Sequence, residues 1–275
     1  MLVAARPYLA AFSARFQLML QYRMAALAGF ATQCWWGGIR IMVFAAFYGA
    51  NAAAAPISLA DAVTYVWLGQ ALLALLPWLA DPEIGQAVRT GGVGYDRLRP
   101  LDAYGYWYAR TLGWMLARAA PRAVLMLLAA GIVLPLAGLE AWAWRPPSGL
   151  AAALLFAPAF ALMTALATAV VMLANIVVAA SLNERGVNAV LTPLVIVFSG
   201  SLLPLNFYPP ALQPWLHLQP FAGLVDIPFR IYFGNLAGDA ALQSLALQAG
   251  WTLALVGLGR FAMERVMRRL EMQGG

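Results

Sequence analysis

The chain has 275 residues, of which 63% are hydrophobic and only 10% charged, and its mean hydropathy is +0.76. Soluble domains carry roughly 25% charged residues, so the composition excludes a water-soluble globule and leaves room for about six membrane spans of ~20 residues. The net charge of +6 comes from arginines scattered between apolar blocks, a distribution that indicates membrane topology and not nucleic-acid binding. We therefore predict one all-α polytopic membrane domain over residues 1–275.

The N-terminal stretch, residues 6–22, has the pattern of an amphipathic helix. Ser13, Gln17 and Gln21 form a polar line at four-residue spacing among apolar side chains. We predict a helix lying in the inner membrane interface, with a plain extension of the first span as the alternative. Three arginines of this region are then placed to meet lipid phosphates: Arg6, Arg15 and Arg23.

Two spans are predicted next, over residues 24–50 and 60–80. Arg40 lies inside the first of them, and a charge at that depth costs at least ~2.5 kcal/mol, so it should face protein or water. It is either a subunit-interface or pathway residue, or an arginine that snorkels to nearby headgroups. Pro77 is expected to kink the inner end of the second span. Cys34, the only cysteine, excludes a disulfide within the chain.

The longest polar interruption is residues 81–110, on the predicted inner side. Asp81 can cap a short helix over residues 82–90, with Pro82 at the first helical position and Glu83 in the first turn. A short capped helix followed by an arginine-rich stretch suits a soluble partner, although an ordinary solvated loop is the alternative. The candidate contact residues are Asp81, Glu83, Ile84, Val88, Arg89, Arg97 and Arg99.

The remaining apolar blocks predict four further spans. Arg118 and Arg122 in the third span either follow the inner surface or line a cavity open to that side; the pattern leaves both possible. Asn175 in the fourth is expected to hydrogen-bond across helices. The four spans are residues 111–138, 150–182, 187–205 and 240–263.

Residues 204–239, before the last span, contain six prolines yet remain apolar. This favours short helices that dip into the outer leaflet over one spanning helix. Asp226 and Arg230 lie four residues apart and can pair. His217, the only histidine, has no metal-ligand companions and is read as a structural polar residue.

Orientation follows from the basic residues. Most of the 17, all of them arginine, fall on the predicted inner side, which predicts that both termini lie on the cytoplasmic side. The chain lacks GxxxxGK[ST], HExxH, GxSxG and CxxC motifs. We therefore expect no catalytic, metal or cofactor site in this chain, and an energy source on a partner.

Four blocks, in this order and spacing, carry a resemblance over nearly the whole chain: ARFQLMLQYRMAALAGF, GGIRIMVFAAFY, IGQAVRTGGVGYDRLRPLDAYGYWYAR and LPLNFYPPALQPWLHLQPFAGLVDIPFRIYFG. The chain resembles permease subunits of ABC-2-type transporters, in particular the family with paired permeases and a separate ATPase. None of the blocks is diagnostic alone.

The resemblance implies a membrane subunit of an exporter. Residues 6–22 would be its connecting helix, and residues 82–90 its coupling helix, which docks on the ATPase. Two permease chains, a sister chain or a second copy being the partner, would join two ATPase subunits that bind ATP and Mg. The pathway would run between the permeases, beside Arg40 and Asn175, with an outer gate at Asp226 and Arg230.

Two other functional classes fit the composition. One is a membrane-embedded enzyme that modifies lipids, which would need clustered catalytic side chains at one membrane face. The other is a non-transporting scaffold or secondary transporter. A bound ATPase distinguishes the exporter from either class, and the transported substrate is not specified by any residue pattern.

Overall fold

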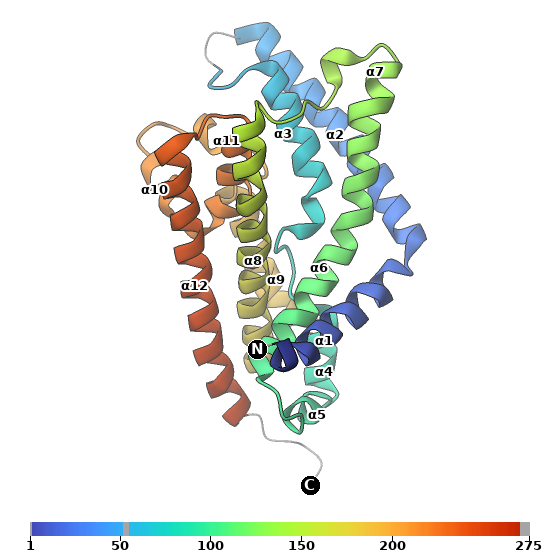
Figure 1. Ribbon diagram of the computed structural model, residues 1–275, viewed down its shortest axis with the longest axis vertical. Coiled ribbons are helices and arrows are strands. Elements are labelled where there is room, and N and C mark those ends of the chain that lie inside the picture. The colour runs from blue at the N-terminus through green and yellow to red at the C-terminus, as the bar shows by residue number, and fades with distance from the viewer. Residues whose placement is uncertain (1, 52–54, 270–275) are drawn as a thin grey trace.

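The computed structural model describes residues 2–51 and 55–269, with the backbone alone described at residues 2–4, 51, 97 and 269. Within these residues the regular structure is entirely helical, and no strand occurs among them (Figure 1). The predicted all-α fold is confirmed to this extent.

Three of the described helical segments are long and apolar enough to cross a membrane, judged by length and composition. The central one is α8, because 72% of its most apolar window is buried inside the chain, against 17% for each of the other two. Helix α12 packs along α8 (Figure 1). The three segments are Ala103–Leu136, Leu150–Ser181 (α8) and Gly238–Arg268, the last within α12 (Gly238–Arg269).

The first segment begins eight residues earlier than the predicted span. Asp102 accepts a hydrogen bond from the Gly105 backbone N–H at 2.8 Å and so caps the helix there. The sequence analysis placed residues 103–110 outside the span because they belong to the polar interruption. The helix nevertheless begins at Ala103, because a cap residue such as Asp102 starts a helix without apolar neighbours. The segment runs through α6 (Ala103–Leu128), the π-helical turn η3 (Ala129–Val133) and α7 (Leu134–Leu136).

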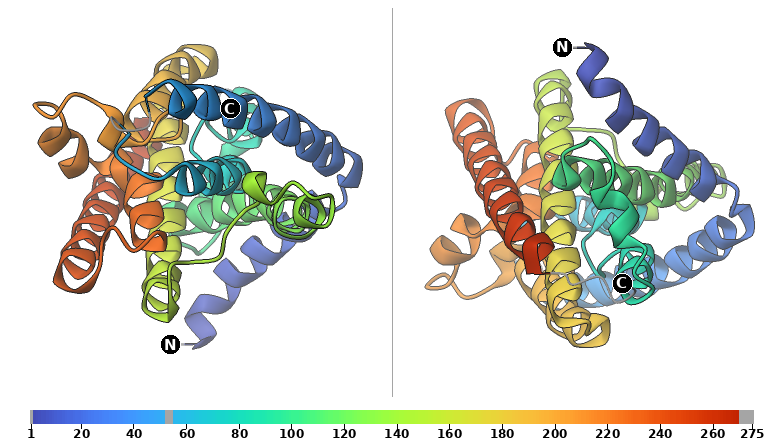
Figure 2. Two further views of the ribbon diagram at one scale, coloured as in Figure 1. Left: turned by 90° about the horizontal axis from the view of Figure 1, so that it is seen from above. Right: turned by 90° about the horizontal axis from the view of Figure 1, so that it is seen from below.

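The first two helices are α1 (Leu2–Leu20) and α2 (Arg23–Asn51). They meet at an angle, with α1 along α6 and α2 against α3, as the views from above and below show (Figure 2). The contact of α1 with α6 is close, since a Cβ atom on Gly113 would lie 2.6 Å from the Phe12 carbonyl oxygen. Both predicted N-terminal helices are therefore present.

Helix α3 (Leu59–Ala71) is much shorter than the span predicted over residues 60–80. A single 3-10 turn, η2 (Leu73–Leu75), follows it, and Leu76 is extended with φ −71° and ψ 142°. The residue before a proline is disfavoured in the helical region, and Leu76 precedes Pro77. Pro77 therefore ends the 3-10 turn at Leu75, while α3 itself has already ended at Ala71, so the predicted continuous helix through residue 80 is wrong.

Helix α9 (Glu184–Phe198) likewise ends before residue 205, the predicted limit of the fifth span. Its start is defined by Asn183, whose side chain accepts a hydrogen bond from the Gly186 N–H at 2.9 Å. Past its end, Gly200 has φ +89°, which only glycine adopts readily. With 15 residues, α9 is shorter than the ~20 that a straight spanning helix needs.

Arg40 of α2 reaches the chain just beyond α9. Its guanidinium donates hydrogen bonds to the Ser201 carbonyl at 2.6 Å and to the Leu202 carbonyl. Of the two surroundings expected for this arginine, protein or water, the structure shows protein. It supplies donors to carbonyls that lie outside any helix.

The proline-rich region between α9 and α12 folds into short helices, as predicted. Leu224 and Phe229 from this region are fully buried against Leu166 and Met163 of α8. The segments are η5 (Leu205–Phe207), α10 (Gln213–Leu218), η6 (Pro220–Leu224) and α11 (Asp226–Tyr232).

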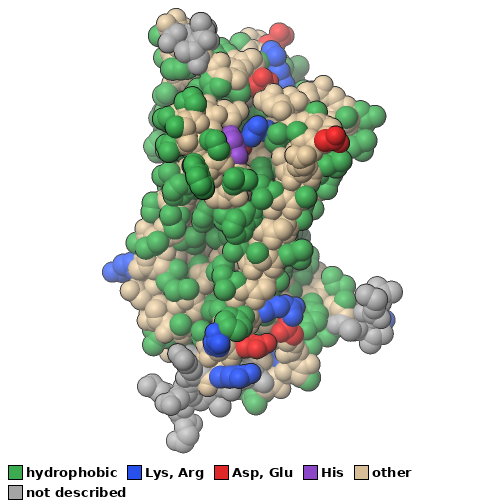
Figure 3. All heavy atoms as spheres, turned by 90° about the vertical axis from the view of Figure 1, so that its left-hand side faces the viewer, with side chains coloured by type: hydrophobic (Ala, Val, Ile, Leu, Met, Phe, Trp, Pro, Cys, Tyr) green, Lys and Arg blue, Asp and Glu red, His purple; other side chains and the backbone are tan. Residues whose placement is uncertain are grey.

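Charged side chains lie toward the two ends of the long axis on the face that Figure 3 shows, with hydrophobic side chains prominent between them. The end opposite α10 and α11 carries the polar segment that the sequence singled out (Figure 1). Its two helices are α4 (Pro82–Arg89) and α5 (Val93–Arg97).

Candidate functional site

Helix α4 is the predicted short helix, and its ends are those that the residue types favour. The Asp81 carboxylate accepts a hydrogen bond from the Glu83 backbone N–H at 3.0 Å, which caps the first turn. Pro82 occupies the first turn, where its missing N–H is no loss. After Arg89 the chain reverses through Gly91, which has φ +73°.

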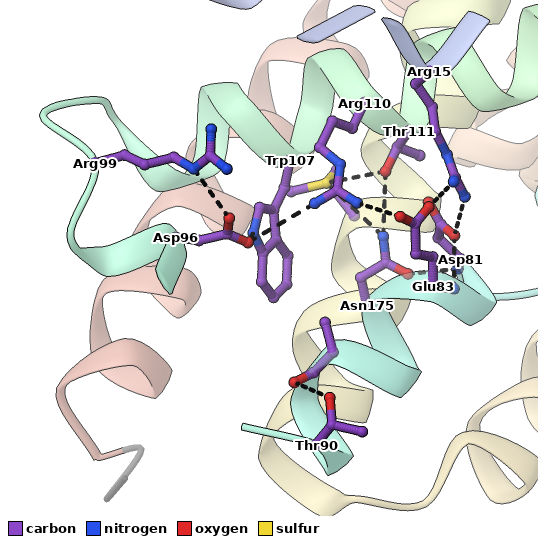
Figure 4. A network of polar contacts seen from close by, with 12 residues as sticks. Arg15, Asp81, Glu83, Thr90, Asp96, Arg99, Trp107, Arg110, Thr111 and Asn175 are labelled. Carbon is purple, nitrogen blue, oxygen red and sulfur yellow. Dashed lines mark hydrogen bonds and ion pairs between the residues drawn. The ribbon is translucent and has the colours of Figure 1, made fainter. Parts of the chain in front are cut away.

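Asp81 is held from α1 by an arginine. The Asp81 side chain is 1% exposed, and its Oδ1 lies 3.2 Å from Nη2 of Arg15, which is 10% exposed (Figure 4). Arg15 also pairs with Glu83 through its other Nη atom. The sequence analysis placed Arg15 toward lipid phosphates; it turns inward and joins α1 to the start of α4.

Burial sets the electrostatics of this pair. It raises the pKa of the Asp81 carboxyl, and the positive charges of Arg15, Arg110 and Arg118 oppose that rise without cancelling it. Burial also lowers the pKa of the Arg15 guanidinium. A buried ion pair adds little net stability, but deleting one partner leaves the other charge buried alone.

A second row of charged groups joins α4 and α5 to α6 (Figure 4). Arg110 of α6 lies 3.0 Å from the Glu83 carboxylate and 3.8 Å from that of Asp96. Asp96 also accepts a hydrogen bond from the Trp107 indole N–H at 3.1 Å and lies 3.5 Å from Arg99. The polar segment is thus folded onto the helices and is not a free loop.

Asn175 of α8 completes the attachment from the interior. Its side-chain oxygen accepts a hydrogen bond from the Asp81 backbone N–H at 2.7 Å, and its amide nitrogen donates to the Thr111 hydroxyl at 3.4 Å. Asn175 and Thr111 are both fully buried. The predicted hydrogen bonding of Asn175 across helices is confirmed, with α4 and α6 as its two partners.

The extended chain before α4 is held by side chains of α9 that the sequence analysis did not single out. Asn188 accepts a hydrogen bond from the Ala80 N–H at 2.9 Å, and Thr192 donates to the Trp78 carbonyl at 2.8 Å. Non-helical backbone in an apolar body requires such partners. Pro77 is the sequence signal that could have prompted the search for them.

Replacing Asn175 with leucine is expected to destabilise the chain by about 2 kcal/mol, because the Asp81 N–H would stay buried without an acceptor. The matched control is Asn235→Leu, at an exposed position, where the change should stay within about 0.5 kcal/mol. Apparent melting temperatures of the purified variants in detergent compare the two. Equal melting of Asn175→Leu and the unaltered chain would contradict this account of the hydrogen bond.

The apolar side of α4 faces its own chain. Ile84 is 1% exposed and belongs to a cluster with Trp107 and Met172, and Val88 packs against the same cluster. Both residues were candidates for contact with a partner. In this conformation Ile84 is covered, so its role here is to anchor the helix.

The outer edge of α4 is formed by other residues, since Pro82, Gln86, Arg89 and Thr90 are exposed. Arg89 also forms an ion pair of 3.0 Å with Glu184 at the start of α9. Glu83 is partly exposed and is shared between two arginines of its own chain. Arg99 is half exposed, while the side chain of Arg97 lies outside the described part of the structure.

Asp226 and Arg230, at the opposite end of the molecule, form the predicted pair at 3.4 Å. The Asp226 carboxylate is 1% exposed, lies 3.1 Å from Nδ1 of His217, and accepts the Leu205 N–H at 3.3 Å. It therefore ties α10 and α11 to η5. Within residues 2–51 and 55–269, no three His, Cys, Asp or Glu side chains are grouped as metal ligands.

No family model matches the chain, and no curated protein sequence matches it.

Proposed function

We propose that the chain is the membrane permease subunit of an ATP-driven exporter, and that α4 is the helix on which a separate ATPase acts. The working unit would contain two ATPase subunits, which bind ATP and Mg, and two permeases, of which the second is a sister chain or another copy. Its place would be a bacterial cytoplasmic membrane, with both termini on the cytoplasmic side. The resemblance of the four sequence blocks motivates this proposal.

The observation that carries it is the attachment of α4. Its exposed edge, with Gln86 and Thr90, is open to a soluble partner, while its inner side is bonded to three other helices. Arg15 connects it to α1, Arg110 to α6, and Asn175 to α8. A partner that moves α4 would therefore move those helices with it.

The proposed topology has six crossings, three of them by the long apolar segments. The others are α2, which has 29 residues, and two crossings in which a short helix, α3 or α9, continues as extended or irregular chain. Such crossings are tolerated in a membrane where protein groups satisfy the backbone. Asn188, Thr192 and Arg40 provide groups of this kind.

At the outer side, α10 and α11 would form the re-entrant cover of the pathway, with Asp226 and Arg230 as the gate. Arg40 and Asn175 are engaged by their own chain, which supports a role in shaping the pathway wall more than in binding substrate. ATP-driven closure of the ATPase pair would shift α4 and switch the permeases between inward-open and outward-open arrangements. This is a two-state rigid-body alternation.

Photo-crosslinking at Gln86 tests the proposal. A benzoylphenylalanine at this exposed position, expressed in native membranes, is expected to capture a subunit that carries a P-loop ATPase motif. The matched control is the same probe at Trp215 in α10, which is 75% exposed at the opposite end and should not capture it. Capture at Trp215 alone, or of no ATPase at either position, would refute the assignment of α4.

A further inference from the structure

A cavity of about 870 Å³ lies between α1, the first turns of α2, α6 and the start of α4. Its lining comes from the C-terminal part of α1 and the N-terminal part of α2, which meet at an angle beside α6 (Figure 2). Its charged lining is strongly unbalanced, with one carboxylate against four guanidinium groups. These side chains are Glu83, Arg15, Arg23, Arg118 and Arg122.

Three of these arginines form no ion pair within the described residues, and Arg118 and Arg122 on α6 are the two placed to share an anion. Arg15 is occupied by Asp81 and Glu83, but no carboxylate of the described residues forms an ion pair with the other three, of which Arg23 is exposed at the rim and Arg118 and Arg122 are the more covered. The Arg118 guanidinium lies 4.4 Å from the centre of the Trp114 ring.

Arg122 uses only part of its donor capacity. Its Nη2 donates to the Ala25 carbonyl at 3.2 Å, and its Nε is buried beside Gly29 of α2 without a hydrogen-bond partner among the described residues, which leaves Nη1 as the free donor for a ligand. Arg118 and Arg122 lie one helical turn apart on α6, so their guanidinium groups lie on the same side of the helix. A phosphate bound there would receive donors from both.

The rest of the lining is apolar. Leu18 and Met19 come from α1, Leu27 from α2 and Leu125 from α6, and α6 belongs to one of the segments suited to cross a membrane. Basic pockets between membrane helices suit anionic headgroups, and the apolar walls suit an acyl chain, which a free anion does not have.

We propose that this cavity binds one anionic phospholipid, with its phosphate between Arg118 and Arg122 and an acyl chain along the apolar walls. The proposal rests on the match between the arginine side chains and an anionic headgroup, and on the match between the apolar side chains and an acyl chain. It does not depend on the proposed transport function. The lipid would bridge α1, α2 and α6.

Native mass spectrometry of the full-length chain, titrated in detergent with phosphatidylglycerol or phosphatidylcholine, tests the site. One phosphatidylglycerol should bind more tightly than phosphatidylcholine, and Arg118→Gln should weaken its binding about tenfold by removing a charge-assisted contact. Arg118→Lys should retain most of the affinity. The control is Arg268→Gln, at an exposed position on α12, which should bind like the unaltered chain.

A second variant tests the volume without changing the charge. Ala26 lines the cavity, so Ala26→Trp should fill it and weaken phosphatidylglycerol binding while every arginine remains. Equal binding of the two lipids together with no effect of Arg118→Gln would overturn the proposal. Binding of glycerol phosphate as tight as that of phosphatidylglycerol would overturn it too, by showing a site for a soluble anion.

Discussion

Replacing Arg15 with methionine is expected to destabilise the chain by about 3–5 kcal/mol, the usual result of removing one partner of a buried ion pair. Methionine retains much of the side-chain volume, so the main loss is the positive charge beside Asp81. That carboxylate is 1% exposed and would keep only the more distant arginines as opposite charges. Thermal unfolding in detergent, compared with the unaltered chain, measures the effect.

The stability of this variant should depend on pH in a defined direction. Burial already raises the pKa of Asp81, and removal of Arg15 raises it further, so the folded variant binds a proton more tightly than the unfolded chain does. The contribution of Asp81 to the stability of the variant is therefore fully present below the ordinary aspartate pKa and is lost as pH rises through the raised value. The deficit relative to the unaltered chain should be smallest at acidic pH.

Two companion variants make the test specific. Arg6→Met removes an exposed charge from the same helix and should change stability by no more than about 0.5 kcal/mol. Adding Asp81→Asn to Arg15→Met should restore part of the lost stability, because asparagine still caps α4 but carries no charge. A deficit that is independent of pH and unaffected by Asp81→Asn would show that the ion pair is not the cause.

Gly113→Val is expected to cost about 3 kcal/mol, because its side chain would overlap the backbone of α1. A Cβ atom at this position already comes within 2.6 Å of the Phe12 carbonyl oxygen, and a backbone atom cannot move aside as a flexible side chain can. Helix α1 should detach from α6. Limited trypsin digestion should then cleave after Arg15, whose side chain is only 10% exposed in the intact fold.

The matched control for Gly113→Val is a glycine with open space around it. A Cβ atom on Gly257 of α12 meets nothing within 4 Å, so Gly257→Ala should be neutral or slightly stabilising through its helix propensity. If Gly113→Val melts and is digested like Gly257→Ala, then α1 does not rest on α6 as described.

Features set by neighbouring residues could be predicted from the sequence. The start of α4 follows from Asp81 and Pro82, whose side chains act within one turn, and the Asp226–Arg230 pair follows from its four-residue spacing. The apolar run of residues 150–182 was long enough to predict a helix suited to cross a membrane, but not that α8 would be the one buried at the centre.

Features set by distant contacts could not be predicted in this way. The sequence analysis expected Arg15 to meet lipid phosphates, because no local pattern says that Asp81, 66 residues further on, lies opposite it. Ile84 and Val88 share a face of α4, yet the pattern alone does not tell whether that face meets the chain itself or a partner. Pro77 predicts a distortion, but it does not tell that Asn188 and Thr192 hold the extended backbone beyond it.

The break after α3 changes which parts of the molecule act as one body. Residues 78–81 are fastened to the α8–α9 hairpin through Asn175, Asn188 and Thr192, whereas no continuous helix links them to α3. Helix α4 is therefore attached to that hairpin, whereas α3, its neighbour in the chain, is joined to it only through the 3-10 turn and the extended residues that follow. A displacement of α4 would therefore be transmitted to α8 and α9 before it was transmitted to α3.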